Sequence, residues 1–411
     1  MSDASLRLIS AFGFFVMIGI AWVFSKNRNR FPWVTVVWGI GLQWALALLL
    51  LKTQVGRLFF IGVNDVVNRF LAYTNAGVDF VFGGLAQGSE FSFVIDVLPI
   101  ILFMGSFMAV LYHLGIVQRV VDVLAWGLSR TMRLSGAESL AGVANVFLGM
   151  VEASLVIRPY LPTMTRSELF TVMNLGMATV AGSVLLAYVQ ILGGGDFAGH
   201  LVTASLLSAP AGFLIAKVMV PEMETPESGR GAHADIEQET VNVIDAAATG
   251  AINGLRLAAY VGAMLIAFVA LIALLNDSLQ AVGSWAGLPG LTFQRILGWV
   301  MAPVAWIMGI PGQDVVQVGG LLGVKTVLNE FIAYQELGRL ASQGALQPRS
   351  ILIASYALCG FANFGSLAIL LGGIGGVAPS RRSDVAQLGL RSILGGSLTT
   401  FMTACIAGVL S

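Results

Sequence analysis

The amino-acid sequence predicts an all-α polytopic membrane protein with about eight transmembrane helices, two re-entrant hairpins in inverted repeats, and interfacial helices. The first reason is composition: 57% of the residues are hydrophobic and 11% are charged, whereas soluble domains carry about 25% charged residues. The second is the recurrence of apolar runs close to the ~20 residues that cross a bilayer. The third is a pair of glutamates, Glu152 and Glu330, in apolar sequence that glycine or proline interrupts nearby.

The apolar runs define the expected spans in chain order. They cover residues 9–24, 33–51, 93–114, 169–192, 201–220, 246–275, 351–371 and 385–410. Residues 1–5 carry no basic side chain, and no small-residue cleavage site follows the first run, so we expect this run to be a retained helix.

Basic residues set the expected orientation. They concentrate at residues 26–30, 130–133 and 381–382 and at Arg158 and Arg166. Because cytoplasmic loops carry an excess of Lys and Arg, we expect the first span to run inward. An even number of spans then places both termini on the periplasmic side of a bacterial inner membrane.

Three further segments are more polar. Residues 53–90 and 116–134 place charged side chains beside an apolar stripe at helical spacing, which is typical of a helix that lies along the membrane surface. Residues 221–240 contain several glutamates and are expected to form a cytoplasmic loop. Asp96, inside the third span, has no partner that the sequence can assign, so a pairing role and a functional role both stay open.

Two halves of the chain follow one plan. Residues 135–192 and 292–371 each contain an apolar half-helix, a glycine or proline break, a glutamate-bearing half-helix and an interrupted helix. A half-helix such as 137–148, with about 12 residues, is too short to span and should turn back. Paired broken segments of this kind indicate a secondary transporter with its site near the midplane. A carboxylate at the bilayer centre costs about 2.5–3.5 kcal/mol, so Glu152 and Glu330 are candidate ligands of the transported solute.

This plan divides the chain into four expected parts. Residues 1–116 hold the N-terminal spans and an interfacial helix and would form a scaffold. Residues 117–245 hold the first repeat, with the first hairpin in the transport region and a scaffold span. Residues 246–290 hold a scaffold span and a connecting segment, and residues 291–411 hold the second repeat, with the second hairpin and the C-terminal span.

Several other classes of protein are disfavoured. The net charge is zero and no basic cluster is interleaved with aromatic residues, so no nucleic-acid partner is expected. The two cysteines cannot build a metal cage, and the three histidines lack the spacing of a zinc hydrolase. An intramembrane enzyme would need such a metal, a histidine base or a paired acid, and a channel would not need a closed pocket made from two halves. The glycine run at 372–376 follows a helix and not a strand, which argues against a dinucleotide cofactor; no cofactor is expected.

The motifs resemble those of the concentrative nucleoside transporters from about Trp33 to the end of the chain. The signatures are EASLVIRPYL at 152–161, VLNEFIAY at 327–334 and LCGFANFGSLAILLGGIG at 358–375. The resemblance implies a homotrimer of eight-span protomers in the lipid bilayer, each with two re-entrant hairpins. It also implies that nucleosides are moved by an elevator-like motion driven by sodium or protons.

Substrate contacts in the second half follow from the resemblance. Glu330, Asn363 and Ser366 correspond to contacts to ribose, and Phe361 corresponds to a residue that lines the pocket. A carboxylate accepts hydrogen bonds and an amide both donates and accepts, which suits sugar hydroxyls. The alternative is that Glu330 and Asn363 only tie two helices together.

The first-half contacts, which by resemblance read the base, depart from the family pattern. Met150 and Val151 stand where the family has Gln and Thr, and Ser154 replaces a proline, whereas Glu152 and Val184 match. Apolar sites discriminate by only about 1–3 kcal/mol per methylene, less than polar sites that need a paired partner. We therefore expect an atypical base preference, broader or purine-tolerant. The alternative is that Met150 only fills space.

The resemblance also implies a sodium site. Its ligands would be the Asn145 side chain, the Thr179 hydroxyl and the backbone carbonyls of Leu148 and Val180. A hard cation prefers oxygen ligands, and these neutral ligands favour sodium over a proton as the coupling ion. Two alternatives stay open: Asn145 caps or bridges the hairpin, or Glu152 carries a proton.

The predicted function is therefore ion-coupled symport of nucleosides into the cell, with sodium as the expected coupling ion. The alternatives are proton-coupled nucleoside transport and transport of another hydroxyl-bearing solute on the same fold.

Overall fold

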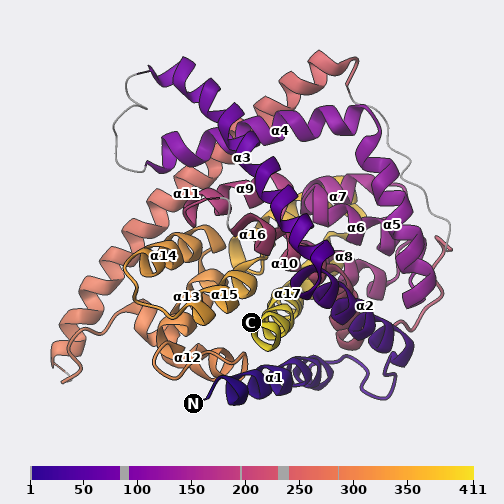
Figure 1. Ribbon diagram of the computed structural model, residues 1–411. Helices are drawn as coiled ribbons and strands as arrows, with labels where there is room; N and C mark the ends of the chain where they lie inside the picture. The colour runs from indigo at the N-terminus through magenta and orange to yellow at the C-terminus, as the bar shows by residue number, and fades with distance from the viewer. Residues whose placement is uncertain (1, 84–91, 195–196, 230–239, 286) are drawn as a thin grey trace.

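The structure is a computed structural model in which residues 2–83, 92–194, 197–229, 240–285 and 287–411 are described. This part of the chain folds into seventeen α-helices with short π and 3₁₀ segments and no strand (Figure 1). The expected surface segment 53–90 and loop 221–240 run into residues 84–90 and 230–239, which lie outside the described residues.

Eight spans can be traced in the described part of the chain, as the sequence predicts. Six helices are long and apolar enough to cross a membrane; they are α1 (Asp3–Val23), α2 (Trp33–Lys52), η2 with α4 (Phe93–Val97 and Leu98–His113), α10 (Ala198–Met219), α11 (Val243–Trp285) and η4 with α17 (Pro379–Arg381 and Arg382–Leu410). The other two spans are interrupted helices, α8 (Arg166–Ala178) with α9 (Gly182–Ile191), and α15 (Pro348–Leu358) with α16 (Phe364–Val377).

The remaining helices are the two hairpins and the connecting helices. The first hairpin is α6 (Gly136–Phe147) with α7 (Met150–Val156), and the second is α13 (Val315–Val327) with α14 (Glu330–Ser342). Helices α3 (Gln54–Phe82), α5 (Ile116–Met132) and α12 (Phe293–Ile307) connect these elements. Helices α3 and α5 confirm the helical character expected of 53–90 and 116–134, and their place at the membrane surface stays a prediction.

The order of elements is the same in two consecutive stretches of chain. From α4 to α10 and again from α11 to α17, a long helix is followed by a short connecting helix, a hairpin, an interrupted helix and another long helix. Each stretch crosses the membrane three times, and an odd number of crossings makes the second stretch start from the opposite side. The repeats are therefore inverted, as in many secondary transporters.

Helices α4 and α11 form one seam along the outside of the molecule (Figure 1). Glycines allow their backbones to approach closely: a Cβ atom placed at Gly250 would lie 2.5 Å from the carbonyl oxygen of Gly105. Small residues at such crossings are typical of helix packing in membranes. Helix α11 runs from Val243 to Trp285 and is about 65 Å long at 1.5 Å per residue, so it continues well beyond residue 275, where the expected span ends.

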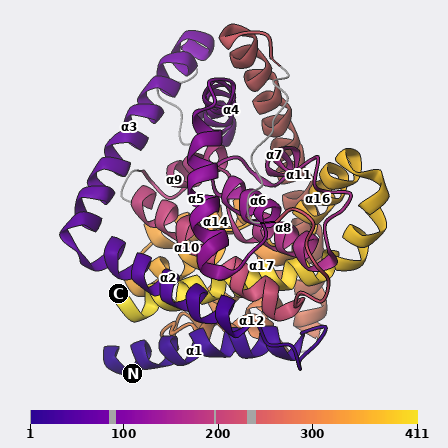
Figure 2. The same cartoon turned by 90° about the vertical axis from the view of Figure 1, so that its right-hand side faces the viewer.

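Helices α10 and α17 form the core. In the apolar windows of these two helices 89% and 83% of residues are buried, against 17% in α11 and 22% in η2 with α4. Figure 2 shows α17 and α10 surrounded by other elements, while α3 and α11 lie at the edges. The seam formed by α4 and α11 is therefore largely exposed in the single chain, whereas α10 and α17 are enclosed by other helices.

Two local structures were not foreseen from sequence. The π-helix η2 begins the third span, and there Asp96 accepts a hydrogen bond from the Ser92 amide at 2.6 Å. This contact gives Asp96 a hydrogen-bond partner at the start of its own helix. At the base of the first hairpin, the buried Lys217 ammonium lies 2.7 Å from Glu138 and 3.3 Å from Glu222, which ties α6 to α10.

Candidate functional site

The breaks of the two interrupted helices lie against each other in the core. A Cβ atom placed at Gly360, in the second break, would lie 3.0 Å from the carbonyl oxygen of Met177 and 3.1 Å from that of Ala178, at the end of α8. The second arm of each hairpin packs on the interrupted helix of the other repeat, α7 on α16 and α14 on α9. Unwound backbone and the starts of four helix segments therefore gather in one region.

Hydrogen bonds fix the carboxylate of Glu330 in this region. Glu330 is the first residue of α14, and the preceding Asn329 caps the helix by accepting a hydrogen bond from the Ile332 amide at 3.0 Å. The Glu330 side chain is 3% exposed. Its two carboxylate oxygens accept hydrogen bonds at 2.7 Å, one from the Tyr188 hydroxyl and one from the Asn363 amide, so one carboxylate joins α9, α14 and the start of α16.

Asn363 positions the neighbouring ribose-contact candidate. It is the N-cap of α16, where its side-chain oxygen accepts a hydrogen bond from the Ser366 amide at 2.7 Å. Capping residues of this kind satisfy backbone donors at a helix start. The predicted residues Glu330, Asn363 and Ser366 are thus brought together, and the partly buried Phe361 lies two residues before Asn363 on the unwound segment.

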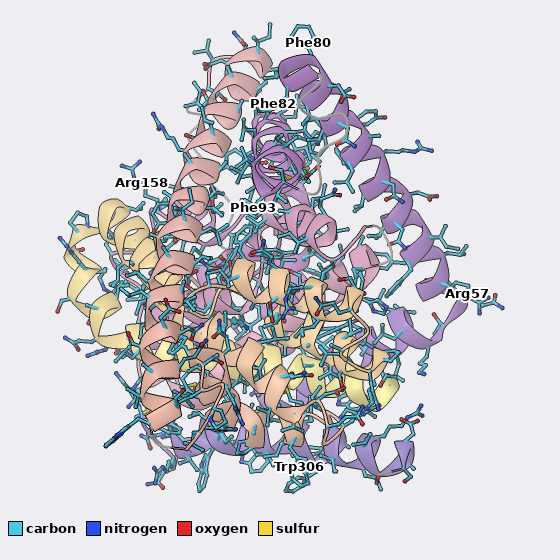
Figure 3. The ribbon with its side chains drawn as sticks, turned by 90° about the vertical axis from the view of Figure 1, so that its left-hand side faces the viewer. Arg57, Phe80, Phe82, Phe93, Arg158 and Trp306 are labelled. Carbon is cyan, nitrogen blue, oxygen red and sulfur yellow. The ribbon has the colours of Figure 1, made fainter. Side chains whose placement is uncertain are left out.

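Aromatic residues of both repeats cluster next to Glu330: Tyr188 donates to its carboxylate, and Phe331 follows it in α14. The ring centroids of Tyr188 and Phe331 are 4.8 Å apart, and those of Phe93 and Phe331 are 6.0 Å apart. Figure 3 places Phe93 in the middle of the molecule, while Arg57 and Arg158 lie at opposite edges. Sequence reasoning missed Tyr188. The available signal was a phenolic hydroxyl inside an apolar run, which needs a partner when it is buried.

Glu152 lies in the second arm of the first hairpin. It follows Gly149, whose φ of 120° is a backbone conformation that favours glycine. A Cβ atom at Gly149 would lie 2.9 Å from a carboxylate oxygen of Glu152, so the carboxylate lies over the hairpin tip. Glu152 is an exposed residue in the single chain, in contrast to the enclosed Glu330.

The apolar residues beside Glu152 pack against glycines of both repeats. A Cβ atom at Gly176 of α8 would lie 3.0 Å from the Met150 Cβ, and one at Gly373 of α16 would lie 3.1 Å from a Val151 methyl group. Met150 is buried, which fits a space-filling role as well as a place at the edge of a pocket. Val184 is also buried, at the start of α9.

The candidate sodium ligands lie at the end of α6 and the end of α8. Asn145 is 1% exposed; its side-chain amide donates to the Ala141 carbonyl at 3.0 Å, and among the described residues its side-chain oxygen has no hydrogen-bond partner. The Thr179 hydroxyl lies 3.3 Å from the Asn145 carbonyl oxygen and 2.8 Å from that of Leu175. A buried oxygen without a donor fits a cation that prefers oxygen ligands.

The backbone members of the predicted set adjoin these side chains. Leu148 is the C-cap of α6, and Val180 is fully buried next to Thr179 in the break of the interrupted helix. Carbonyl groups at helix ends lack intrahelical partners. Hence the four predicted ligands lie on two adjoining elements, since α6 packs on α8.

Comparison with known proteins decides the family. A profile described as "Na+ dependent nucleoside transporter C-terminus" matches residues 200–408, the corresponding N-terminal profile matches residues 12–85, and a "Nucleoside recognition" profile matches residues 94–195. The chain belongs to the concentrative nucleoside transporter family. The predicted family and fold are confirmed, and the chain is a multi-pass membrane transporter, not an enzyme.

Relatives of this concentrative nucleoside transporter come from bacteria and animals. The uncharacterized transporter YutK of Bacillus subtilis is 43% identical over 399 residues, which are 97% of this chain and 98% of that protein. Solute carrier family 28 member 3 of Homo sapiens is 40% identical over an alignment of 419 positions that covers 98% of this chain and 60% of that protein.

Solved structures of a relative, CNTnw, share the fold of this transporter. One is in an inward-facing substrate-bound state, with a TM-score of 0.92, 43% identity and 98% coverage of both chains. Another, a doubly substituted variant of CNTnw in an outward-facing state, has a TM-score of 0.94 and 43% identity over 99% of this chain and 98% of that chain. The relative therefore adopts both states needed for alternating access.

Proposed function

We propose that this transporter carries nucleosides into the cell in symport with sodium by an elevator-type alternating-access mechanism. The proposal rests on the two hydrogen bonds that fix the Glu330 carboxylate. Asn363 from the second repeat and Tyr188 from the first each donate one, at 2.7 Å. A carboxylate fixed in this way is oriented before the ligand arrives, which reduces the entropy lost on binding.

Ribose would bind at Glu330, Asn363 and Ser366, beside Phe361. Each carboxylate oxygen has two lone pairs, so Glu330 can accept hydrogen bonds from sugar hydroxyls while it keeps its present partners. Charge-assisted hydrogen bonds of this kind are about twice as strong as neutral ones. The proposal thus assigns the sugar to the second repeat.

The base would bind beside Glu152 and Val184, next to Met150 and Val151. Among the described side chains there, Glu152 is the one strong acceptor, and its two apolar neighbours pack against Gly176 and Gly373. Contacts that are mainly apolar discriminate weakly between bases. We therefore propose a broader or purine-tolerant base preference.

Sodium would bind at Asn145 and Thr179 with the Leu148 and Val180 carbonyls. The support is the buried Asn145 oxygen, which has no partner in the described part of the chain. An ion there would join the tip of the first hairpin to the interrupted helix behind it, and so order the hairpin that carries Glu152. Binding of the ion and of the nucleoside would then be coupled.

The proposed setting is a homotrimer in a bacterial inner membrane with both termini periplasmic. The alternation of spans and the basic residues at 26–30 and 381–382 support this orientation. The seam of α4 and α11, which is largely unburied in the single chain, leaves a surface for lipid or for another protomer.

Uptake into proteoliposomes tests the proposed function. Labelled purine and pyrimidine nucleosides, with free bases as controls, are offered under an inward sodium gradient, an inward proton gradient or neither. The expected result is uptake of several nucleosides, purines included, only with sodium, and a relative gain for pyrimidines in Met150→Gln, which restores a polar amide. Uptake driven by protons alone, or of no nucleoside, would contradict the proposal; an unchanged preference in Met150→Gln would leave Met150 with a packing role.

A further inference from the structure

A lysine lies fully buried in the second hairpin. Lys325 is 0% exposed, and its ammonium donates to the carbonyl oxygen of Ala357 at 2.7 Å and to the hydroxyl of Thr400 at 3.0 Å. The ring centroid of Phe401 lies 5.8 Å from the ammonium nitrogen, which is within the range of a cation–π contact. Ionisable side chains inside a membrane protein are costly and indicate a function, yet the proposed binding of nucleoside and sodium makes no use of this one.

Lys325 occupies the place in the second repeat that Asn145 occupies in the first. Helix α6 ends two residues after Asn145, and helix α13 ends two residues after Lys325. Each helix is followed by a leucine C-cap, Leu148 or Leu328, whose amide bonds to the carbonyl of the residue just before Asn145 or Lys325. The two side chains therefore leave equivalent positions in the last turn of the first hairpin arm.

Both positions also adjoin the same part of the interrupted helix in their own repeat. Thr179, which donates to the Asn145 carbonyl, is the C-cap of α8. Ala357, which accepts from Lys325, is one residue before the end of α15. The last carbonyls of a helix lack intrahelical donors and carry partial negative charge, so a cation is favoured at both places.

The two residues differ in what they contribute. Asn145 contributes an oxygen that has no partner in the described residues, whereas Lys325 contributes the positive charge. We propose that the Lys325 ammonium is a tethered cation that takes, in the second repeat, the place in which the first repeat binds sodium. Its acceptors are a neutral carbonyl and a neutral hydroxyl, the oxygen types that the proposed sodium site uses, and ammonium N–H groups bond to the same lone pairs.

The consequence concerns ion stoichiometry, and it rests on the proposed sodium coupling. The second hairpin keeps its cation throughout the cycle, so only the first hairpin waits for an ion from solution. One nucleoside would then travel with one sodium ion. The fixed charge would also make the two hairpins respond differently to sodium. At low sodium concentration the first hairpin would lose order, whereas the second would stay ordered.

Two substitutions of Lys325 distinguish the proposed role as a tethered cation from a purely structural role. Lys325→Asn removes the charge and installs the oxygen ligand of the first repeat, whereas Lys325→Met removes the charge and installs no such ligand. In proteoliposomes at clamped voltage, fluxes of ²²Na⁺ and tritiated nucleoside are measured together. We expect about one sodium ion per nucleoside in the wild type and about two in Lys325→Asn. Uptake by Lys325→Asn should also depend more steeply on sodium concentration, because a second sodium ion would have to bind before transport. We expect uptake by Lys325→Met to fall at least tenfold at every sodium concentration.

Thermal unfolding of the detergent-purified proteins gives a second readout. An ion that binds only the folded state raises the melting temperature with its concentration. Replacing choline chloride with sodium chloride should therefore stabilise Lys325→Asn more than the wild type, and Lys325→Met no more than the wild type.

Several outcomes would overturn the inference. They are two sodium ions per nucleoside in the wild type, an unchanged sodium count in a functional Lys325→Asn, equal sodium stabilisation of the two variants, and failure of Lys325→Asn to fold even at high sodium. Sodium-independent uptake by the wild type would instead refute the proposed coupling, so failure of the coupling and failure of the inference are told apart.

Discussion

At the scale of single residues, the account depends on a carboxylate that both repeats hold. Glu330 accepts hydrogen bonds from Tyr188, 142 positions earlier in the chain, and from Asn363, 33 positions later. If Glu330 and Asn363 only held two helices together, their side chains would not need to be oriented toward a ligand. Here the Glu330 carboxylate is held in one orientation, and Asn363 caps the start of α16, which places Ser366 beside it. The sugar-binding role and the packing role of Glu330 therefore make different predictions about charge.

Replacing Glu330 with glutamine tests the role of the charge. In Glu330→Gln an amide donor would face either the Tyr188 hydroxyl or the Asn363 amide, and the charge available to sugar hydroxyls would be lost. Hydrogen bonds to charged groups contribute about 1.5–3 kcal/mol, so nucleoside uptake should fall at least tenfold. Glu336→Gln, on the exposed side of the same helix where Glu336 pairs with Arg339, is the matched control and should keep uptake within twofold. Near-normal uptake by folded Glu330→Gln would remove Glu330 from the site.

Sequence reasoning found some of these residues and missed others for a physical reason. Glu330 and Asn363 are polar residues in short motifs within apolar sequence. Because placing a polar side chain in a membrane costs free energy, such residues stand out as functional candidates from the sequence alone. The places of Tyr188 and Lys325 depend on partners such as Thr400 that lie far away in the chain. Hydropathy does not reveal such pairs. The chemistry of Met150 was visible, but its contact with Gly176 depends on how α7 packs on α8.

At the scale of elements, glycines decide which helices can touch. Helices α4 and α11 approach so closely at Gly105 and Gly250 that a Cβ atom would collide with backbone. Gly262, further along α11, has only a side-chain carbon of Leu98 at 3.7 Å from its Cβ position. One helix therefore offers a tight and a loose glycine for comparison.

Alanine substitution at these two glycines tests the seam. Gly250→Ala should destabilise the protein by about 1–3 kcal/mol, as overpacking usually does, and so lower the melting temperature in detergent. Gly262→Ala should leave it unchanged or slightly higher, because alanine is favoured over glycine in a helix by about 0.5–1 kcal/mol. Equal effects of the two changes would show that the close approach of α4 and α11 does not hold in the protein.

The elements were largely predictable from sequence. Apolar length located all eight spans, and half-helices too short to span located both hairpins. Sequence did not show that α11 extends to 43 residues, because its ends carry polar residues that a hydropathy window excludes. It also did not show the π-helical start at Phe93–Val97, since a change in helix winding leaves little trace in composition.

At the scale of the whole molecule, the repeats meet through their breaks. The first hairpin lies on the second interrupted helix through Val151 and Gly373, and the second hairpin lies on the first interrupted helix through Glu330 and Tyr188. An ion that orders the first hairpin would therefore organise a pocket to which both repeats contribute. Sodium and nucleoside should each raise the affinity for the other by the same factor, since such coupling is reciprocal.

The most direct test measures this coupling without transport. Nucleoside affinity of the purified protein is determined by calorimetry with sodium and with choline in its place, for the wild type and for Asn145→Ala. We predict that sodium raises wild-type affinity roughly 5–150-fold, the usual range for coupled sites, and that Asn145→Ala loses most of this gain while it keeps the affinity seen without sodium. Equal nucleoside affinity with and without sodium in the folded wild type, or full sodium dependence in Asn145→Ala, would contradict the proposed ion-coupled site.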